Sequence, residues 1–199
     1  MILVSCSAGG IYNWFRATMS ETQPHQYALV AYVRNSLGQF VENLRAELHP
    51  AHAHLPAHLS VLPPRPLVGG EEAAFDALRQ ACANVEPFDV EMGEVEAFIP
   101  TTPTVFIRVA RAAYRLRELH DVLNTDGLTY TEPLVYMPHL TIAKLDDNQR
   151  AREVFEIARN RWAQFDGSRC VTIDQLTFVR GRDHRWTDIA DIGLTRKNR

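Results

Sequence analysis

The chain has 199 residues, of which 46% are hydrophobic and 23% charged, so it carries enough apolar side chains for one sizeable core or for two small lobes. This composition excludes disorder over most of the length. The formal net charge of -3 argues against a protein that coats nucleic acid through bulk positive charge. No apolar run approaches the roughly 20 residues that a membrane helix needs, so we expect a soluble, cytoplasmic protein without membrane contact.

The beginning of the chain shows little periodicity and contains a second potential start, Met19. We expect residues 1–25 to form a flexible N-terminal extension and residues 26–199 to form a single two-lobed domain. The three cysteines are far apart in the sequence and include no C-x-x-C pair. Their spacing indicates a reducing compartment and no disulfide framework.

Elements in the first part of the chain follow from the spacing of its apolar residues. In chain order we expect a strand (27–33), a helix (36–48), a loop rich in histidine and proline (49–56), a short strand (58–62) and a helix (71–85). Ser36 is expected to cap the first helix, because its side-chain oxygen can accept a hydrogen bond from a backbone N–H. Pro63 and Pro64 are expected to end the short strand, because they cannot donate ladder hydrogen bonds.

The second part of the chain repeats this alternation of strands and helices. In chain order we expect a hairpin (88–99 and 104–109), a helix (112–123), a strand (139–145), a helix opened by Asp147 and a final pair of strands (170–180 and 186–194). Strands mixed with helices and antiparallel hairpins predict the α+β class. The similarity of the two parts predicts a bilobal duplicated fold, with two antiparallel sheets flanked by outer helices around a central cleft.

One short strand pattern occurs twice: a histidine, an apolar residue, a hydroxyl residue and a second apolar residue. The first copy starts at His58 and the second starts 81 residues later, at His139. Residues i and i+2 of a strand share a face about 6–7 Å apart, so His58 is expected beside Ser60 and His139 beside Thr141. The intervening apolar residues point the other way. Each strand is therefore predicted to have one reactive face and one core face.

These two strands, embedded as Ala-His-Leu-Ser-Val-Leu and Met-Pro-His-Leu-Thr-Ile-Ala, resemble the paired HxT motifs of the two-histidine (2H) phosphoesterase superfamily. The closer resemblance is to its 2′-5′ RNA ligase-like branch, which includes cyclic phosphodiesterases, and it covers roughly residues 26–194. Ser60 stands where threonine is commoner in the family and keeps the hydroxyl group. The resemblance implies that His58 and His139 are catalytic and that Ser60 and Thr141 bind the substrate phosphate.

The chemistry of such a reaction agrees with these residue types. Opening a 2′,3′-cyclic phosphodiester needs one group that deprotonates the attacking water and another that protonates the departing ribose oxygen. Two imidazoles, with an unperturbed pKa of about 6.5, can supply a neutral base and a protonated acid without a metal or cofactor. Hydroxyl groups can donate hydrogen bonds to the non-bridging oxygens, where negative charge builds. The sequence does not say which histidine is the acid.

Other residues are weaker candidates for substrate contact. Arg65 is a candidate for the phosphate-binding rim, as are Lys144, Arg180, Arg182 and Arg185. Aromatic candidates for stacking on a base are Phe106, Tyr130, Tyr136 and Trp186. Three histidines precede His58 in the proline-rich loop and suggest a zinc site. A solvated loop is the favoured interpretation there, because no acidic or cysteine partner is nearby.

Several functions remain open at this point. The favoured hypothesis is a monomeric, metal-independent phosphoesterase acting on an RNA 2′,3′-cyclic phosphate end or on a small cyclic nucleotide. A second is 2′-5′ RNA ligation, which reverses that chemistry in the same site. A third is an RNA- or nucleotide-binding protein without turnover, which the presence of both histidines disfavours. A fourth is a zinc enzyme that uses the histidine-rich loop.

Overall fold

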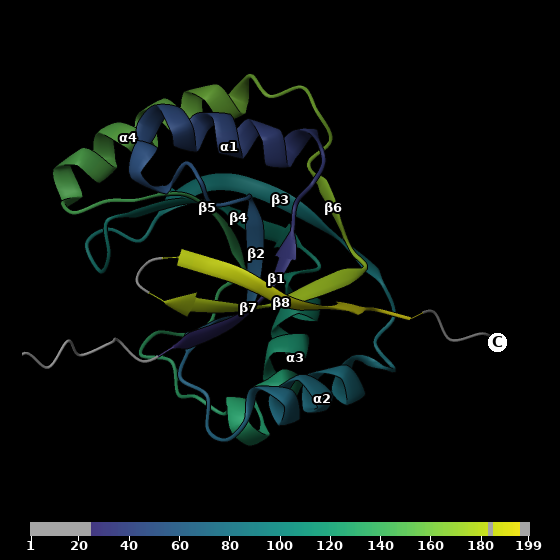
Figure 1. The fold of residues 1–199 in the computed structure, drawn as a ribbon. Coiled ribbons are helices and arrows are strands. Elements are labelled where there is room, and N and C mark those ends of the chain that lie inside the picture. The colour runs from purple at the N-terminus through teal and green to yellow at the C-terminus, as the bar shows by residue number, and fades with distance from the viewer. Residues whose placement is uncertain (1–24, 183–184, 196–199) are drawn as a thin grey trace, which may run out of the picture.

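The computed structural model describes residues 25–182 and 185–195 (Figure 1). Apart from residue 25, the predicted N-terminal extension lies outside the described residues. The strands are β1 (Gln26–Tyr32), β2 (His58–Arg65), β3 (Phe88–Ala97), β4 (Thr104–Arg111), β5 (His139–Lys144), β6 (Cys170–Ile173), β7 (Gln175–Arg182) and β8 (Arg185–Gly193). The helices are α1 (Ser36–Leu48), α2 (Glu71–Cys82), α3 (Ala113–Leu123) and α4 (Asn148–Ala163), with short 3-10 turns at Pro50–His52 and Asp126–Leu128.

The described strands form one antiparallel sheet in the order β6-β3-β4-β5-β2-β1-β7-β8. Its two four-stranded halves meet where β5 lies beside β2, and among the described residues the only register pair at this junction is Leu59 with Leu140. The predicted α+β class is confirmed. The expectation of two separate sheets is wrong, because this single bridge joins the halves into one continuous sheet.

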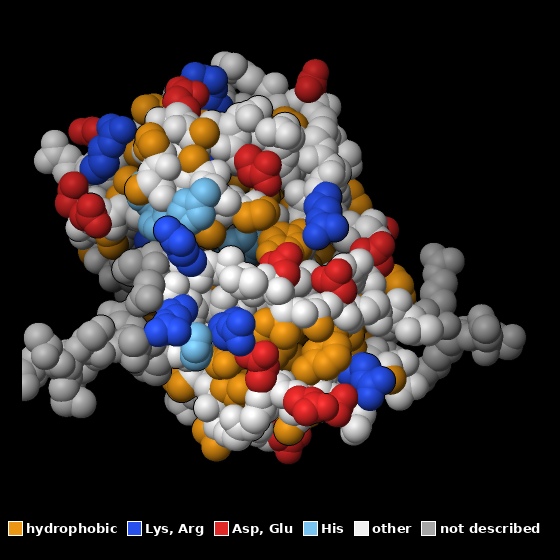
Figure 2. Space-filling model, in the orientation of Figure 1, with side chains coloured by type: hydrophobic (Ala, Val, Ile, Leu, Met, Phe, Trp, Pro, Cys, Tyr) orange, Lys and Arg blue, Asp and Glu red, His pale blue; other side chains and the backbone are white. Residues whose placement is uncertain are grey.

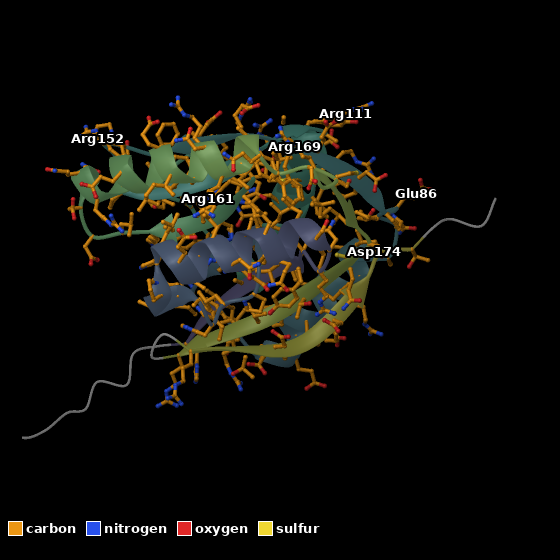
Figure 3. The ribbon with its side chains drawn as sticks, turned by 90° about the horizontal axis from the view of Figure 1, so that it is seen from above. Glu86, Arg111, Arg152, Arg161, Arg169 and Asp174 are labelled. Carbon is orange, nitrogen blue, oxygen red and sulfur yellow. The ribbon has the colours of Figure 1, made fainter. Side chains whose placement is uncertain are left out.

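The helices cover the two halves in a crossed arrangement. Helices α1 and α4 lie side by side on the half that contains β5 (Figure 1 and Figure 3), and the ion pair Arg161–Glu47 joins them at 3.0 Å. Helices α2 and α3 pack on the half that contains β2. Helix α1 directly follows β1 in the chain, yet it packs against β5 in the opposite half. The two halves are therefore interleaved in sequence.

Strand β2 runs through the two prolines that were expected to end it. Its register with β1 shifts between the pairs Tyr27–Arg65 and Leu29–Leu62, so β2 contains one extra residue there. Such a bulge interrupts the ladder locally, and proline is tolerated at a bulge because no N–H is required at that point. The strand consequently continues to Arg65.

The helix starts are set by side chains just outside the helices. Asn35, rather than the expected Ser36, caps α1, since its Oδ1 accepts hydrogen bonds from two backbone N–H groups at 3.1 and 3.2 Å. Asp147 caps α4 as expected, accepting from the N–H of Arg150 at 2.8 Å. None of the described helices combines the length and hydrophobicity that crossing a bilayer requires.

The two faces of the sheet differ in burial. On β2 and β5, the apolar residues that alternate with the histidines and hydroxyl residues are buried in the main core, beneath the helices. His58, Ser60, His139 and Thr141 lie on the other side and are only partly buried. We call this side the open face; Figure 2 shows the side chains of the molecule by type. A small apolar cluster of Ala28, Val30 and Val179 is separate from the main core.

Candidate active site

The junction between β2 and β5 brings the four predicted residues together. Because the strands are antiparallel, the single bridge at the junction puts His58 opposite Thr141 and Ser60 opposite His139. Directly opposite residues have Cβ atoms about 4.5–5.5 Å apart, and diagonal neighbours about 7–8 Å. The two histidines therefore occupy diagonal corners of a compact group, with a hydroxyl group at each remaining corner.

Each imidazole is oriented by a hydrogen bond to a backbone carbonyl two residues upstream. His58 Nδ1 lies 2.8 Å from the oxygen of Pro56, and His139 Nδ1 lies 2.6 Å from the oxygen of Met137. A carbonyl oxygen can only accept, so Nδ1 must carry the proton. In the neutral ring, Nε2 is then left with a free lone pair. Both histidines are thus held in the same tautomer.

Aromatic rings surround the two imidazoles unequally. The His139 ring has its centroid 5.2 Å from that of Phe98 and 5.0 Å from that of Phe106, and these two phenyl rings stack on each other. His58 meets the ring of Tyr32 edge-on at 6.4 Å. The hydroxyl of Tyr32 donates to Asp188 at 2.6 Å, which fixes this ring in place. Phe106, a predicted stacking residue, is buried and packs on His139 instead of facing solvent.

Burial lowers the pKa of both histidines below the ordinary value. For His58, the hydrogen bond to Pro56 raises the pKa in part, whereas the positive charge of Arg45 and the neighbouring His139 lower it further. For His139, the hydrogen bond to Met137 is the opposing contribution to its pKa. Both rings therefore favour the neutral form, which differs from the simple expectation of one neutral and one protonated imidazole. A bound phosphodiester anion would favour protonation.

Two side chains bind the strand carbonyls at the junction. Arg45, buried on α1, donates from Nη2 to the carbonyl of Thr141 at 2.7 Å and from Nη1 to the carbonyl of Leu55. Tyr136 donates its hydroxyl to the carbonyl of Ser60 at 2.8 Å. Arg45 was not predicted from the sequence, although an arginine within the apolar stripe of a helix was a signal. Tyr136 was predicted as a stacking residue, and its hydrogen bond to Ser60 was not predicted.

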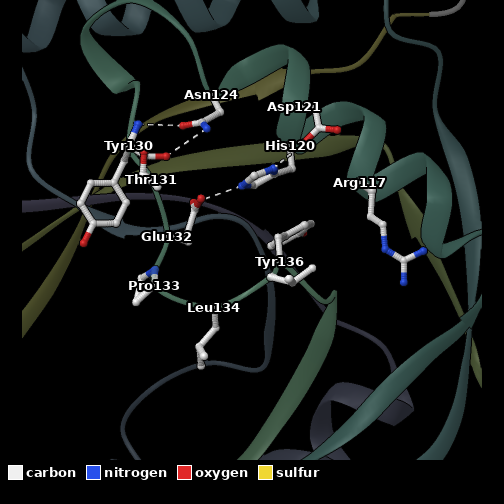
Figure 4. Close-up of a pocket in the computed structure, with 11 residues that line it drawn as sticks. Arg117, His120, Asp121, Asn124, Tyr130, Thr131, Glu132, Pro133, Leu134 and Tyr136 are labelled. Atoms are coloured by element: carbon white, nitrogen blue, oxygen red, sulfur yellow. Dashed lines mark hydrogen bonds and ion pairs between the residues drawn. The ribbon is translucent and has the colours of Figure 1, made fainter.

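Arg65 does not lie on the open face. It is fully buried, and its guanidinium donates to Asn124 at 2.6 Å, to the carbonyl of Leu128 at 3.1 Å and to Glu132. Glu132 also contacts His120 at 3.1 Å, as Figure 4 shows. Burial alone would raise the pKa of Glu132, but His120 and Arg65 outweigh it and hold that pKa below its ordinary value. The arginine thus anchors the loop that leads to β5.

The remaining candidates are dispersed. Lys144 is exposed at the end of β5, Trp186 is partly buried against the small apolar cluster on β1 and β7, and Arg180 forms an ion pair with Glu71 at 2.9 Å. His49 and His52 lie with their Nδ1 atoms 3.0 Å apart in the loop before β2. Among residues 25–182 and 185–195, no group of three or more His, Cys, Asp or Glu side chains is placed to hold a metal ion.

Comparison with known sequences shows a family. The model of the 2′-5′ RNA ligase superfamily matches residues 33–185. A candidate phosphoesterase of Halalkalibacterium halodurans is 26% identical over 119 residues, which are 59% of this chain and 69% of that protein. A second candidate phosphoesterase, from Oceanobacillus iheyensis, is 24% identical over 122 residues, which are 60% of this chain and 70% of that protein.

Solved structures share the fold at low sequence identity. Escherichia coli LigT in complex with NADP+ has a TM-score of 0.57 and 14% identity, covering 88% of this chain and all of LigT. LigT in complex with 3′-AMP has the same TM-score and identity over 87% of this chain. A protein of Thermus thermophilus gives a TM-score of 0.53 at 14% identity, over 87% of this chain and all of its own. At these identities the likeness concerns the fold.

Proposed function

This chain belongs to the 2′-5′ RNA ligase superfamily, and from that membership we propose that it is a metal-independent phosphoesterase that hydrolyses cyclic phosphodiesters. The substrate class is an RNA 2′,3′-cyclic phosphate end or a small cyclic nucleotide. The observation that carries the proposal is the matched state of the two histidines. Each is fixed through Nδ1 on the same face of the sheet, with Nε2 free.

The proposed step is acid–base catalysis across one phosphorus atom. Nε2 of one histidine takes a proton from water while the water oxygen forms a bond to phosphorus. The bond from phosphorus to one ribose oxygen breaks, and Nε2–H of the other histidine protonates that oxygen. The product is a phosphomonoester beside a free hydroxyl, and one water has been consumed. Proton exchange with solvent returns both histidines to their starting states.

Ser60 and Thr141 have the complementary role in this proposal. They occupy the other two corners of the group, so their hydroxyls are near both imidazoles. Hydrogen bonds from these hydroxyls to the non-bridging phosphate oxygens stabilise the charge that develops in the transition state. A nucleotide as ligand class is supported by the LigT structures solved with NADP+, ATP and 3′-AMP, which share the fold.

The test is product analysis with purified protein in EDTA. The substrates are 2′,3′-cyclic AMP and a short RNA that ends in a 2′,3′-cyclic phosphate. We expect hydrolysis in the presence of the chelator, and a fall of about 10²- to 10⁴-fold for His58→Ala and for His139→Ala. The matched control is His54→Ala, because His54 is an exposed histidine in the loop just before β2. This variant should keep wild-type turnover and wild-type thermal stability.

Alternative outcomes distinguish the other hypotheses. A 2′-5′ linkage formed from a 5′-hydroxyl RNA and the cyclic phosphate end would assign ligation, in which the 5′-hydroxyl takes the place of water, to this site. Binding of both substrates without turnover would assign a binding protein. Activity that EDTA abolishes, or that survives in both histidine variants, would contradict the proposed mechanism.

A further inference from the structure

The open face extends from β5 onto its neighbour β4. Arg108 of β4 pairs with His139 in the sheet register, and Phe106 pairs with Thr141. Directly opposite residues share a face of the sheet, so Arg108 lies on the open face beside His139. Ile107, between the two β4 residues, is buried in the main core on the other face. A cationic side chain is therefore the cross-strand neighbour of one of the two imidazoles.

The register also shows on which side of the site Arg108 lies. His58, Ser60, His139 and Thr141 form the compact group at the junction, which we call the histidine–hydroxyl group. Across the strands, Arg108, His139 and Ser60 form one row. His58 is in the next row and on β2, two strands away from β4. Arg108 thus lies outside the histidine–hydroxyl group, beyond His139.

Glu96 holds the guanidinium of Arg108 on this outer side. Its carboxylate lies 2.7 Å from Nε of Arg108, and it belongs to β3, which is on the opposite side of β4 from β5. The ion pair therefore draws the guanidinium away from the position that the cyclic phosphate would take. The two side chains are 43% and 40% exposed, so a solute can reach them.

The terminal nitrogens of Arg108 are available to a ligand. Glu96 engages Nε, and Nη1 and Nη2 form no hydrogen bond or ion pair with any residue in the described part of the chain. In Arg45 and Arg65, by contrast, the terminal nitrogens are bonded within the protein. The free end of a guanidinium is a planar fork of donors that matches two oxygens of a phosphate.

We propose that Arg108 binds a second phosphate group of the substrate, outside the cyclic phosphate that the two histidines would open. The inference rests on the proposed function and specifies its substrate as a nucleotide with a further phosphate. That phosphate is either a 5′-phosphate or the internal phosphodiester of an RNA end. Nη1 and Nη2 of Arg108 donate to its oxygens, and Glu96 positions the guanidinium.

The first experiment compares three substrates that share the reacting group. They are 2′,3′-cyclic AMP, its 5′-phosphorylated form and the dinucleotide ApA ending in a 2′,3′-cyclic phosphate. We expect a higher kcat/KM for one or both of the substrates with a second phosphate, and the preferred one identifies its source. Arg108→Met should lower this preference over 2′,3′-cyclic AMP by about 5- to 30-fold, because charge-assisted hydrogen bonds are lost.

The matched control is Arg111→Met, which removes the same charge from the same strand. Arg111, labelled in Figure 3, is 83% exposed at the end of β4 and also faces a glutamate of β3, Glu91, at 3.8 Å. This variant should keep the preference. The inference would be overturned if the wild type showed no preference, if the preference survived Arg108→Met, or if Arg111→Met reduced it equally. A general defect of Arg108→Met would slow all three substrates alike, leave the preference intact and count against the inference.

The second experiment does not depend on turnover. Calorimetry compares adenosine 3′,5′-bisphosphate with 3′-AMP, which differ by one phosphate. The bisphosphate should bind more tightly to the wild type, and Arg108→Met should remove most of the difference. Equal affinities in the wild type would overturn the second-phosphate site. If no substrate is hydrolysed but the difference in affinity depends on Arg108, the proposed reaction fails and this site stands.

Discussion

The hydroxyl of Tyr136 donates a 2.8 Å hydrogen bond to the backbone carbonyl of Ser60. The loop that precedes His139 is thereby fastened to the strand that carries His58. Among the described residues, β2 and β5 share one register pair, so this contact adds a further tie between the two strands' surroundings at the junction. The ring of Tyr136 also stacks on His120 at 4.1 Å, so the hydroxyl is held in place from behind.

Tyr136→Phe should therefore disturb catalysis more than stability. Loss of one neutral hydrogen bond costs about 0.5–1.5 kcal/mol of unfolding free energy, because the stacked ring remains. The strands that carry His58 and His139 lose a shared restraint, and kcat should fall by roughly tenfold. Steady-state kinetics on 2′,3′-cyclic AMP and thermal unfolding check this. An unchanged kcat would show that the junction needs no such restraint.

The hydroxyl groups of Ser60 and Thr141 should stabilise the transition state. Ser60→Ala and Thr141→Ala should each lower kcat by about 30- to 1,000-fold, which corresponds to about 2–4 kcal/mol. Thr141→Ser keeps the hydroxyl and should recover most of the rate. Thr187→Ala, at an exposed position of β8, controls for the loss of a β-branched residue from a strand. If Thr141→Ser were as slow as Thr141→Ala, the loss of rate would come from the missing methyl group and its packing, and not from the hydroxyl.

The pH profile follows from the lowered pKa values of both histidines. In the free protein the acid histidine loses its proton below the ordinary pKa of about 6.5, so kcat/KM should already be falling at pH 7. A bound phosphodiester anion favours protonation, and the alkaline limb of kcat should therefore lie at higher pH than that of kcat/KM. Coincident limbs would contradict this assignment.

Arg45→Met tests one cause of this pH dependence. Its positive charge lowers the pKa of His58, so removing it should raise that pKa, and an NMR titration of the ring should show the change. Arg45→Lys keeps the charge and should keep the lowered pKa. The sign for stability follows from the same pKa shift. Because the unfolded chain binds protons that the folded protein excludes, acidification below about pH 6.5 should lower the unfolding free energy.

Arg65 should contribute to the free energy of unfolding. Arg65→Met leaves the partly buried Glu132 without its cation and should lower the unfolding free energy by about 3–5 kcal/mol. The double variant Arg65→Met/Glu132→Leu removes both charges and should regain part of that loss. Denaturant unfolding of the two variants measures the difference. A double variant less stable than Arg65→Met would show that the pair itself is not the cause.

The sequence predicted which side chains share a face of β2 and β5 better than it predicted the contacts that support these strands. Alternation along a strand is local, so it was enough to place His58 beside Ser60 and to turn Leu59 into the core. Asn35 and Ser36 are adjacent polar residues that can each cap a helix. Which of them does so depends on where the first helical turn begins, and here Asn35 is the cap. Arg65 looked like a rim residue because its partners lie 59 to 67 positions away.

The sheet and the helix positions depend on similarly distant contacts. No local sequence pattern indicates that β2 and β5 meet at one bridge, because these strands are far apart along the chain. The crossing of α1 to the opposite half is equally invisible in its own amphipathic pattern, which shows that a face is buried but not against which strand. The predicted number of elements and their order were therefore more accurate than the predicted division into two sheets.

The crossing of α1 has a mechanical consequence for the site. This helix is tied by short connections to β1 on one side and towards β2 on the other, while its buried face, including Arg45, is bound to β5. Parting the two halves would pull α1 away from one of them and expose its apolar face to water. The fold thus restrains the spacing of the two imidazoles, and under the proposed function substrate would reach them across the uncovered side of the sheet without a hinge having to open.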